Sequence, residues 1–395
     1  MKKRKSFGRK IKRTKNIYRP KKTKKQKLIG TVIFIIVVVI IGFVGFFIGK
    51  PVLDFFGRVE PEKEEAWTPP VTAAPEADIT EAAEEQPVVS ESTAETTEDN
   101  FEEKPPLVSG KKAFSLTAGA LSNRASLAAA LAKAKNMGYN AAVIQLKDEK
   151  GYIHYQSEIE ELSGKELVIG ELKLSEIYEI FLNADMLPIA EVSVLKDNKG
   201  AMFFPDISYK CYGEDTSWLD YFSTGEPMRW IAPDSEEGKA YIGKICDEIT
   251  ACGIDNIVLS NLVFPPIQNY DKAYLSPVYF ASDRHNMLYG FIREGMTVKL
   301  RAEDILSGEY NNTAEILKDK SKLKGSRIAV VIDRESFSAE DGYPADDKGL
   351  VEDILSAASE KIGSDISIVP IISVPDSEKI PDILEKMGYD DYIIR

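Results

Sequence analysis

The chain of 395 residues carries a formal net charge of −13, although residues 1–27 contain fifteen Lys or Arg and no Asp or Glu. The remaining chain is therefore strongly acidic, which argues against nucleic acid as a partner, because phosphates are bound by Lys and Arg. Three cysteines are too few for a disulfide framework, and two histidines exclude a His-rich metal site. We therefore expect three free thiols, with a single bridge as the alternative, and no cofactor.

Residues 28–49 form an uncharged, apolar run directly after the basic segment. At ~1.5 Å per residue, a helix of this length spans the ~30 Å hydrocarbon core of a bilayer. Because positively charged flanks stay in the cytoplasm, residues 1–27 are predicted to be a basic cytoplasmic tail. A cleaved signal peptide is the alternative, but its apolar region is shorter, ~7–15 residues, and no small-residue cleavage site follows here. The sequence thus predicts a single-pass protein of the cell membrane with an extracytoplasmic C-terminal domain.

Residues 50–108 are predicted to be a disordered linker. Glu, Thr, Pro, Ala and Ser dominate this acidic stretch, and aromatic residues are few. Such a composition buries too little apolar surface to offset the entropy of ordering the chain. The linker is expected to hold the domain formed by residues 109–395 away from the membrane.

Within residues 109–395, short β-branched runs alternate with stretches of helical pattern. Strands are predicted at residues 113–119, 140–148, 187–197, 254–264, 296–300, 327–333, 366–374 and 391–395. Helices are predicted at residues 123–137, 173–184 and 235–253. This alternation and number of strands favour an α/β fold, a (β/α)8 TIM-like barrel, with a doubly wound open sheet as the alternative. No G-x-G-x-x-G or Walker motif follows a strand, which argues against nucleotide binding.

Polar residues at the carboxyl ends of the predicted strands are the candidate site, because catalytic and binding groups of such barrels lie at those ends. They are Gln145, Lys147, Asp148, Lys196, Asp197, Ser260, Asn261, Asp333 and Glu335. Trp230 is a further candidate, since aromatic faces pack against the C–H groups of sugars, although core packing explains most such rings.

Glu191 lies inside a predicted core strand. Alternation places Ile189, Glu191, Ser193 and Leu195 on one face of that strand. An ionisable group buried in a core strand is usually either ion-paired or part of a functional site. Glu191 is therefore either paired with a neighbouring Lys or Arg or catalytic.

Asp333 and Glu335 would point the same way if their strand extends that far; otherwise they lie in a solvated loop. Glycoside hydrolysis needs two carboxyl groups, ~5–5.5 Å apart for retention of configuration and ~6.5–9.5 Å apart for inversion. Glu191 with Asp333 or Glu335 is the candidate catalytic set.

Four segments occur in a recognisable order: AAVIQLKDEKGYI at 141–153, IAEVSVLKD at 189–197, WIAPD at 230–234 and IDNIVLSNLVFP at 254–265. Together they resemble a family of bacterial glycoside hydrolases with a TIM-type barrel, known mainly as a domain of unknown function on secreted or membrane-anchored proteins. The resemblance implies that fold and a carbohydrate ligand.

The chain departs from this family at positions that bear on chemistry. Gln145 and Ser260 stand where the family has Asp, Val263 stands where it has Arg, and Glu191 occupies the place of another Arg. Neither an amide nor a hydroxyl can act as a carboxylate nucleophile or as a carboxylic general acid. If those Asp residues are catalytic in the family, this chain has lost them.

Three hypotheses remain open. The first is a degenerate barrel that binds cell-wall polysaccharide or peptidoglycan without cleaving it. Its ligand site would comprise Gln145, Lys147, Asp148, Lys196, Asp197, Trp230, Ser260 and Asn261. The second is an active glycoside hydrolase that uses Glu191 with Asp333 or Glu335. The third is a non-catalytic protein-interaction module of the cell envelope.

Overall fold

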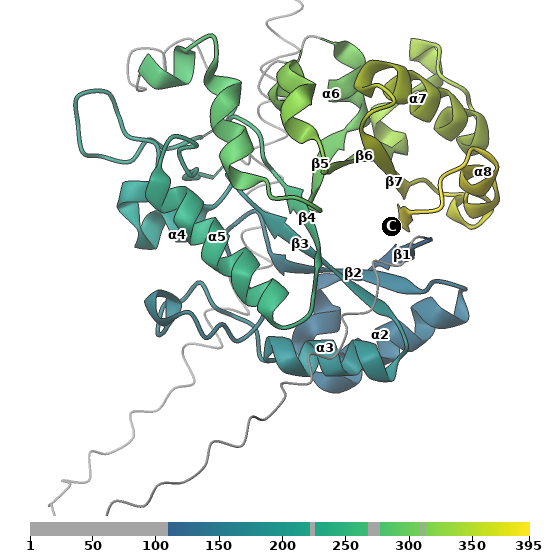
Figure 1. The fold of residues 1–395 in the computed structure, drawn as a ribbon, viewed down its shortest axis with the longest axis horizontal. Helices are drawn as coiled ribbons and strands as arrows, with labels where there is room; N and C mark the ends of the chain where they lie inside the picture. The colour runs from purple at the N-terminus through teal and green to yellow at the C-terminus, as the bar shows by residue number, and fades with distance from the viewer. Residues whose placement is uncertain (1–109, 222–225, 268–276, 309, 311–312) are drawn as a thin grey trace, which may run out of the picture. The chain divides into compact units, whose positions relative to one another are not determined.

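The computed structural model describes residues 110–221, 226–267, 277–308, 310 and 313–395. Within these residues eight parallel strands close into a barrel in chain order, with β8 hydrogen-bonded to β1 (Figure 1). The strands are β1 (Lys112–Ser115), β2 (Ala141–Lys147), β3 (Leu187–Ser193), β4 (Asn256–Ser260), β5 (Thr297–Arg301), β6 (Arg327–Asp333), β7 (Ser367–Ser373) and β8 (Tyr392–Ile394). The predicted barrel is therefore confirmed, and the open sheet is excluded.

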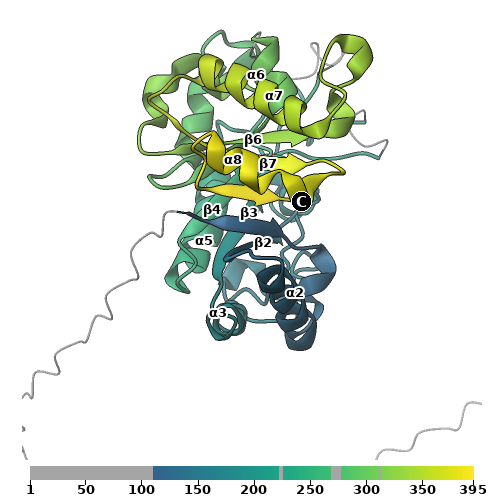
Figure 2. The same cartoon turned by 90° about the vertical axis from the view of Figure 1, so that its right-hand side faces the viewer.

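The α-helices lie outside the ring of strands (Figures 1 and 2). They are α2 (Arg124–Asn136), α3 (Leu174–Asn183), α4 (Asn198–Phe203), α5 (Glu236–Ala251), α6 (Ala302–Ser307), α7 (Asp347–Ile362) and α8 (Pro381–Lys386). Local chemistry sets the bounds of α5: the Ser235 side chain accepts a hydrogen bond from the Gly238 amide, and Gly253 beyond its end has φ +98°. Helix ranges were predicted from the sequence for α2, α3 and α5 and not for α4, α6, α7 or α8.

Two hydrophobic layers hold the barrel together. The larger lies between strands and helices, and the smaller fills the barrel interior. Alternation along β3 assigns Ala190 and Val192 to the outer layer and Ile189 to the inner one, as predicted. Leu195 belongs to the outer layer instead, because β3 ends at Ser193 and the alternation stops there.

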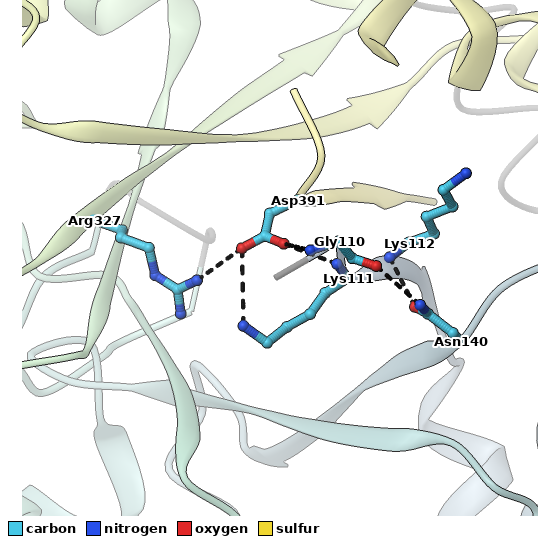
Figure 3. Close-up of polar contacts among 6 residues, drawn as sticks. All are labelled: Gly110, Lys111, Lys112, Asn140, Arg327 and Asp391. Carbon is cyan, nitrogen blue, oxygen red and sulfur yellow. Dashed lines mark hydrogen bonds and ion pairs between the residues drawn. The ribbon is translucent and has the colours of Figure 1, made fainter. Parts of the chain in front are cut away.

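A carboxylate closes the amino-terminal end of the barrel, where β1 meets β8 (Figure 3). Asp391 Oδ1 accepts hydrogen bonds from the amides of Gly110 (2.9 Å) and Lys111 (2.8 Å). Asp391 Oδ2 lies 3.1 Å from Arg327 Nη1 and 3.8 Å from Lys111 Nζ. Asn140 Nδ2 donates to the Gly110 carbonyl at 2.8 Å. These contacts tie the first residues of the domain to the last strand.

The basic tail (1–27), the apolar run (28–49) and the linker (50–108) lie outside the described residues, so those predictions stay predictions. None of the helices that the structure describes combines the length and hydrophobicity that a membrane span needs.

Candidate functional site

A cavity of about 820 Å³ opens at the carboxyl ends of the strands. Seven of the candidate site residues line it: Gln145, Glu191, Lys196, Trp230, Ser260, Asn261 and Asp333. They come from different strand ends and loops, and barrel closure brings them together. This is the end of the barrel where enzymes with this fold carry their active sites. Lys147, Asp148, Asp197 and Glu335 do not line the cavity.

Glu191 faces the cavity from β3 and shares its carboxylate between two cations. Its Oε1 accepts a hydrogen bond from Lys299 Nζ at 2.6 Å, and its Oε2 lies 3.3 Å from Arg395 Nη2. Lys299 belongs to β5 and Arg395 follows β8, so the three residues meet across the barrel interior. The structure shows Glu191 as an ion-paired group, and a catalytic role for it stays a prediction. Both carboxylate oxygens are engaged.

Burial changes the acid–base behaviour of Lys299. Desolvation lowers the pKa of its ammonium group, the Glu191 carboxylate opposes this shift, and the Arg395 guanidinium adds to the lowering. The result is a pKa below the ordinary lysine value of 10.5. The site therefore contains a cation whose charge is partly destabilised by its own surroundings.

Uncharged polar groups surround this ion cluster. Gln145 pairs in register with Glu191, and its side chain makes no hydrogen bond within the described part of the chain. Ser260 is buried, and its Oγ likewise has no hydrogen-bond partner among the described residues. Asn261 has φ +52° and donates from Nδ2 to Ser193 Oγ at 3.0 Å. The amide groups of Gln145 and Asn261 are thus available to a hydroxyl-rich ligand, whereas the Ser260 Oγ is closed off from solvent.

Trp230 lines the cavity, but it is only 3% exposed. Its Nε1 donates to Oδ2 of the fully buried Asp220 at 3.1 Å. Packing therefore explains most of this ring, and only a small part of its surface can touch a ligand.

Asp333 and Glu335 separate at the end of β6. Asp333 lines the cavity and accepts a hydrogen bond from the Glu335 amide at 3.1 Å, which caps the short turn Arg334–Ser336. Glu335 is exposed outside the cavity. The strand ends at Asp333, so the two carboxylates do not lie on the same face of one strand.

Lys147 and Asp197 form an ion pair inside the barrel wall. Their Nζ and Oδ2 atoms are 2.8 Å apart, and both side chains are fully buried. The register between β2 and β3 shifts between Gln145 and Lys147, and such a bulge redirects the following side chain. Lys147 therefore leaves the face of Gln145 and donates to the Ser193 carbonyl at 2.7 Å. Neither residue of the pair is accessible to a ligand.

The surroundings of this pair explain the first family-like motif. Asp197 Oδ1 accepts from the Gly200 amide at 2.6 Å and caps α4. Gly151 has φ +88°, and a Cβ there would overlap the Asp197 carboxylate. Burial and the neighbouring Asp197 raise the pKa of the Tyr241 hydroxyl well above its ordinary value. Lys147, Gly151 and Asp197 are therefore parts of one structural unit.

Asp148 organises the loop after β2. Its Oδ1 accepts from the amides of Lys150 and Tyr152, both at 2.9 Å, and its Oδ2 lies 3.1 Å from His154 Nε2. Burial alone would raise the pKa of Asp148, but these hydrogen bonds hold it below the ordinary value. Asp148 shapes the loop outside the cavity.

Charged residues that were not named from the sequence also line the cavity: Glu149, Lys299, Arg301, Glu303, Asp304 and Arg395. Lys299 and Arg301 alternate with apolar residues in the segment TVKLR, and that pattern could have identified them. Glu149 pairs with Lys196 at 2.7 Å. Arg301 pairs with Glu303 at 3.3 Å and with Asp304 at 2.8 Å.

The site therefore offers ion-paired carboxylates, hydrogen-bonding side chains and cations around an open cavity. In the described part of the chain, no three His, Cys, Asp or Glu side chains are grouped to hold a metal ion. Such an arrangement suits recognition of a polar, hydroxyl-rich molecule.

Comparison with solved structures finds distant similarities. A hypothetical protein from Ruminiclostridium thermocellum is 20% identical, with 45% of this chain and 88% of that one covered and a TM-score of 0.39. The PgaB (BpsB) glycoside hydrolase domain from Bordetella bronchiseptica is 12% identical, with 72% and 92% covered and a TM-score of 0.42. The β-N-acetylhexosaminidase from Bacteroides fragilis is 10% identical, with 67% and 50% covered and a TM-score of 0.44.

A comparison with curated proteins found no match. A family model does match: residues 113–308 fit the one described as "Putative glycosyl hydrolase domain". This range includes all four segments on which the sequence resemblance rests, and it contributes β1 to β5 of the barrel. Over residues 113–308, about half of the chain, the sequence is therefore similar to this family.

Proposed function

We propose that this chain is a membrane-anchored, extracytoplasmic, glycoside-hydrolase-like protein that binds cell-envelope glycan in the cavity without hydrolysing it. The observation that carries the proposal is the chemistry of the strand ends. Gln145 and Ser260 line the cavity at positions where the family-like motifs have Asp. The Gln145 amide can exchange hydrogen bonds with sugar hydroxyls, the Ser260 hydroxyl is buried, and neither side chain can supply a carboxylate.

The carboxylates that remain in the cavity support the same proposal, because each already has a partner. Glu191 is held by Lys299 and Arg395, Glu149 by Lys196, and Glu303 and Asp304 by Arg301. Asp333 accepts the amide that caps its turn. A general acid has to protonate the leaving oxygen at hydrogen-bond distance, and such a group is not evident among these engaged side chains.

The active hydrolase remains the second candidate because Glu191 and Asp333 face the same cavity. Such an enzyme would use Glu191 and Asp333 as its two carboxyl groups, with Glu335 excluded from the pair by its exposure outside the cavity. Ligand binding would then have to release Glu191 from at least one of its two cations.

The decisive experiment uses the full chain, purified in detergent, with peptidoglycan, wall polysaccharide and a panel of soluble glycans. Binding is measured by co-sedimentation or calorimetry, and hydrolysis by the appearance of new reducing ends. We expect saturable binding and no reducing ends. Asp333→Asn, inside the cavity, should weaken binding, whereas the matched change Glu335→Gln, two residues away and exposed, should leave it unchanged.

Two other results would each replace the proposal. Reducing ends that appear with the wild type and vanish in Glu191→Gln would establish the active hydrolase. Folded protein that neither binds nor cleaves any glycan would favour the protein-interaction module, and crosslinking would then identify its partner.

The membrane anchor and topology are proposed from residues 1–49 alone. The expected result is that the chain fractionates with membranes and that external protease removes the barrel from intact spheroplasts. Recovery of the barrel in the soluble fraction, with a new N-terminus after residue 49, would instead identify a cleaved signal peptide.

A further inference from the structure

The cations at the floor of the cavity have more hydrogen-bonding capacity than their shared carboxylate uses. A guanidinium has five N–H donors and an ammonium has three. Within the described residues, Arg395 makes one side-chain contact, at 3.3 Å to Glu191 Oε2, and Lys299 makes one, at 2.6 Å to Oε1. Most donors on these two side chains are therefore unused by the protein.

Exposure points the same way. The Arg395 side chain is 34% exposed and that of Lys299 is 15% exposed, whereas the Glu191 carboxylate between them is 7% exposed. The cavity floor thus presents the cations to a ligand more than it presents their counter-ion.

The other cations of the cavity differ in this respect. Lys196 has Glu149 as a partner of its own at 2.7 Å. Arg301 is held by two carboxylates, Glu303 and Asp304, at the start of the following helix. Only at Glu191 do two cavity cations share one carboxylate among the residues that the structure describes.

We propose that Lys299 and Arg395 form an anion-recognition site, so that the glycan bound in the cavity carries a carboxylate or phosphate substituent. This inference rests on the proposed glycan binding and specifies its ligand class. Arg395 would bind the anionic group through two parallel N–H donors, the geometry that suits carboxylate and phosphate, while Lys299 would contribute a point charge. Gln145 would contact the neutral hydroxyls of the same sugar.

The test compares an acidic oligosaccharide with its neutral methyl ester and with a phosphate polymer. Oligogalacturonate and its fully methyl-esterified form share one sugar backbone, and poly(glycerol phosphate) supplies the phosphate arm. Each is titrated into the full chain in detergent at fixed, low ionic strength, because salt screens such interactions. We expect the acidic oligosaccharide or the phosphate polymer to bind at least about tenfold more tightly than the methyl ester. Which of the two binds better identifies the source of the anion.

Variants test the assigned residues. Arg395→Gln and Lys299→Met should each reduce anion affinity about tenfold or more while leaving weak methyl-ester binding in place. Arg293→Gln removes a surface arginine that pairs with Asp247 outside the cavity, and it should have no effect. Glu191→Gln should act in the opposite direction and tighten anion binding, because it removes the carboxylate that competes for both cations. Circular dichroism and thermal unfolding confirm that each variant is folded.

The outcomes separate this inference from the proposed function. Equal binding of the acid and its ester, unaffected by Arg395→Gln, would overturn the anion site and leave glycan binding intact. Cleavage of the bound oligosaccharide would overturn the non-hydrolytic proposal and leave the anion site intact. Weaker anion binding in Glu191→Gln would also contradict the inference, because it would show that the carboxylate itself holds the ligand.

Discussion

The two ends of the barrel contain the same charge motif in different settings. At the amino-terminal end, Asp391 is shared by Lys111 and Arg327 (Figure 3). At the carboxyl end, Glu191 is shared by Lys299 and Arg395. One carboxylate between two cations therefore occurs at both ends.

The difference lies in what else each carboxylate does. Asp391 also accepts two backbone amides, and the space beside it is small, about 20 Å³. Glu191 has no backbone donor among the described residues and faces a cavity of about 820 Å³. The first arrangement closes the fold, and the second leaves cation donors available to a ligand. The predictions below test this division, from the largest expected effect to the smallest.

The largest effect on the free energy of unfolding is expected for the buried ion pair of Lys147 and Asp197. Lys147→Met leaves the fully buried Asp197 carboxylate without its cation, so we expect a loss of about 3–5 kcal/mol in the free energy of unfolding. Lys196→Met is the matched control: its partner Glu149 is half exposed, and the loss should be about 1 kcal/mol or less. Urea denaturation measures both. Similar losses for the two variants would contradict the structural role given to Lys147.

The strands were predicted correctly from the sequence, whereas the position of the Lys147 side chain was not. All eight strands were predicted, because apolar β-branched runs report local burial. Lys147 was expected at the site because strict alternation puts it on the same face of the strand as Gln145. A β-bulge between the two residues directs the Lys147 side chain away from the cavity instead, and a single sequence shows no pattern that predicts this bulge. The motif that suggested a ligand site thus includes structural residues.

Contacts across the barrel were beyond the reach of sequence patterns. Glu191 is 108 residues from Lys299 and 204 residues from Arg395 in the chain. Alternation correctly placed Glu191 on the same face of its strand as Ile189, but the partners of Glu191 depend on the closure of β8 onto β1, which is a property of the whole fold. The short helices α4 and α6 were missed because each has only six residues and shows too little periodicity.

The second prediction compares the two shared carboxylates directly. Asp391→Ala removes two backbone hydrogen bonds and leaves Lys111 and Arg327 without their partner, so we expect a loss of about 2–4 kcal/mol in the free energy of unfolding. Glu191→Gln should lose less, about 1–2 kcal/mol, since no backbone hydrogen bond is lost, the amide oxygen can still accept one from Lys299, and Arg395 is partly exposed to water.

Asp391→Asn is the control at the amino-terminal end of the barrel, because its side-chain oxygen can still accept hydrogen bonds from the two backbone amides. This variant should lose only about half as much free energy of unfolding as Asp391→Ala. The measurement is the urea midpoint of each variant at one pH. If Glu191→Gln proves as destabilising as Asp391→Ala, the ion cluster of Glu191, Lys299 and Arg395 also stabilises the fold. The proposed difference between the two ends of the barrel would then be wrong.

The smallest predicted effect is the pH dependence contributed by Lys299. Burial lowers the pKa of this lysine in the folded protein below the unfolded value of about 10.5, despite the opposing Glu191 carboxylate. Between the lowered pKa and about 10.5, the unfolded chain binds more protons than the folded one, so the free energy of unfolding rises with pH across that window. Lys299→Met should lack this rise. Removing the opposing carboxylate in Glu191→Gln should lower the pKa of Lys299 further and extend the window to lower pH. Urea denaturation at several pH values from neutrality to about 10.5 measures the slopes, and parallel curves for the wild type and Lys299→Met would show that this ammonium is solvated as it is in the unfolded chain.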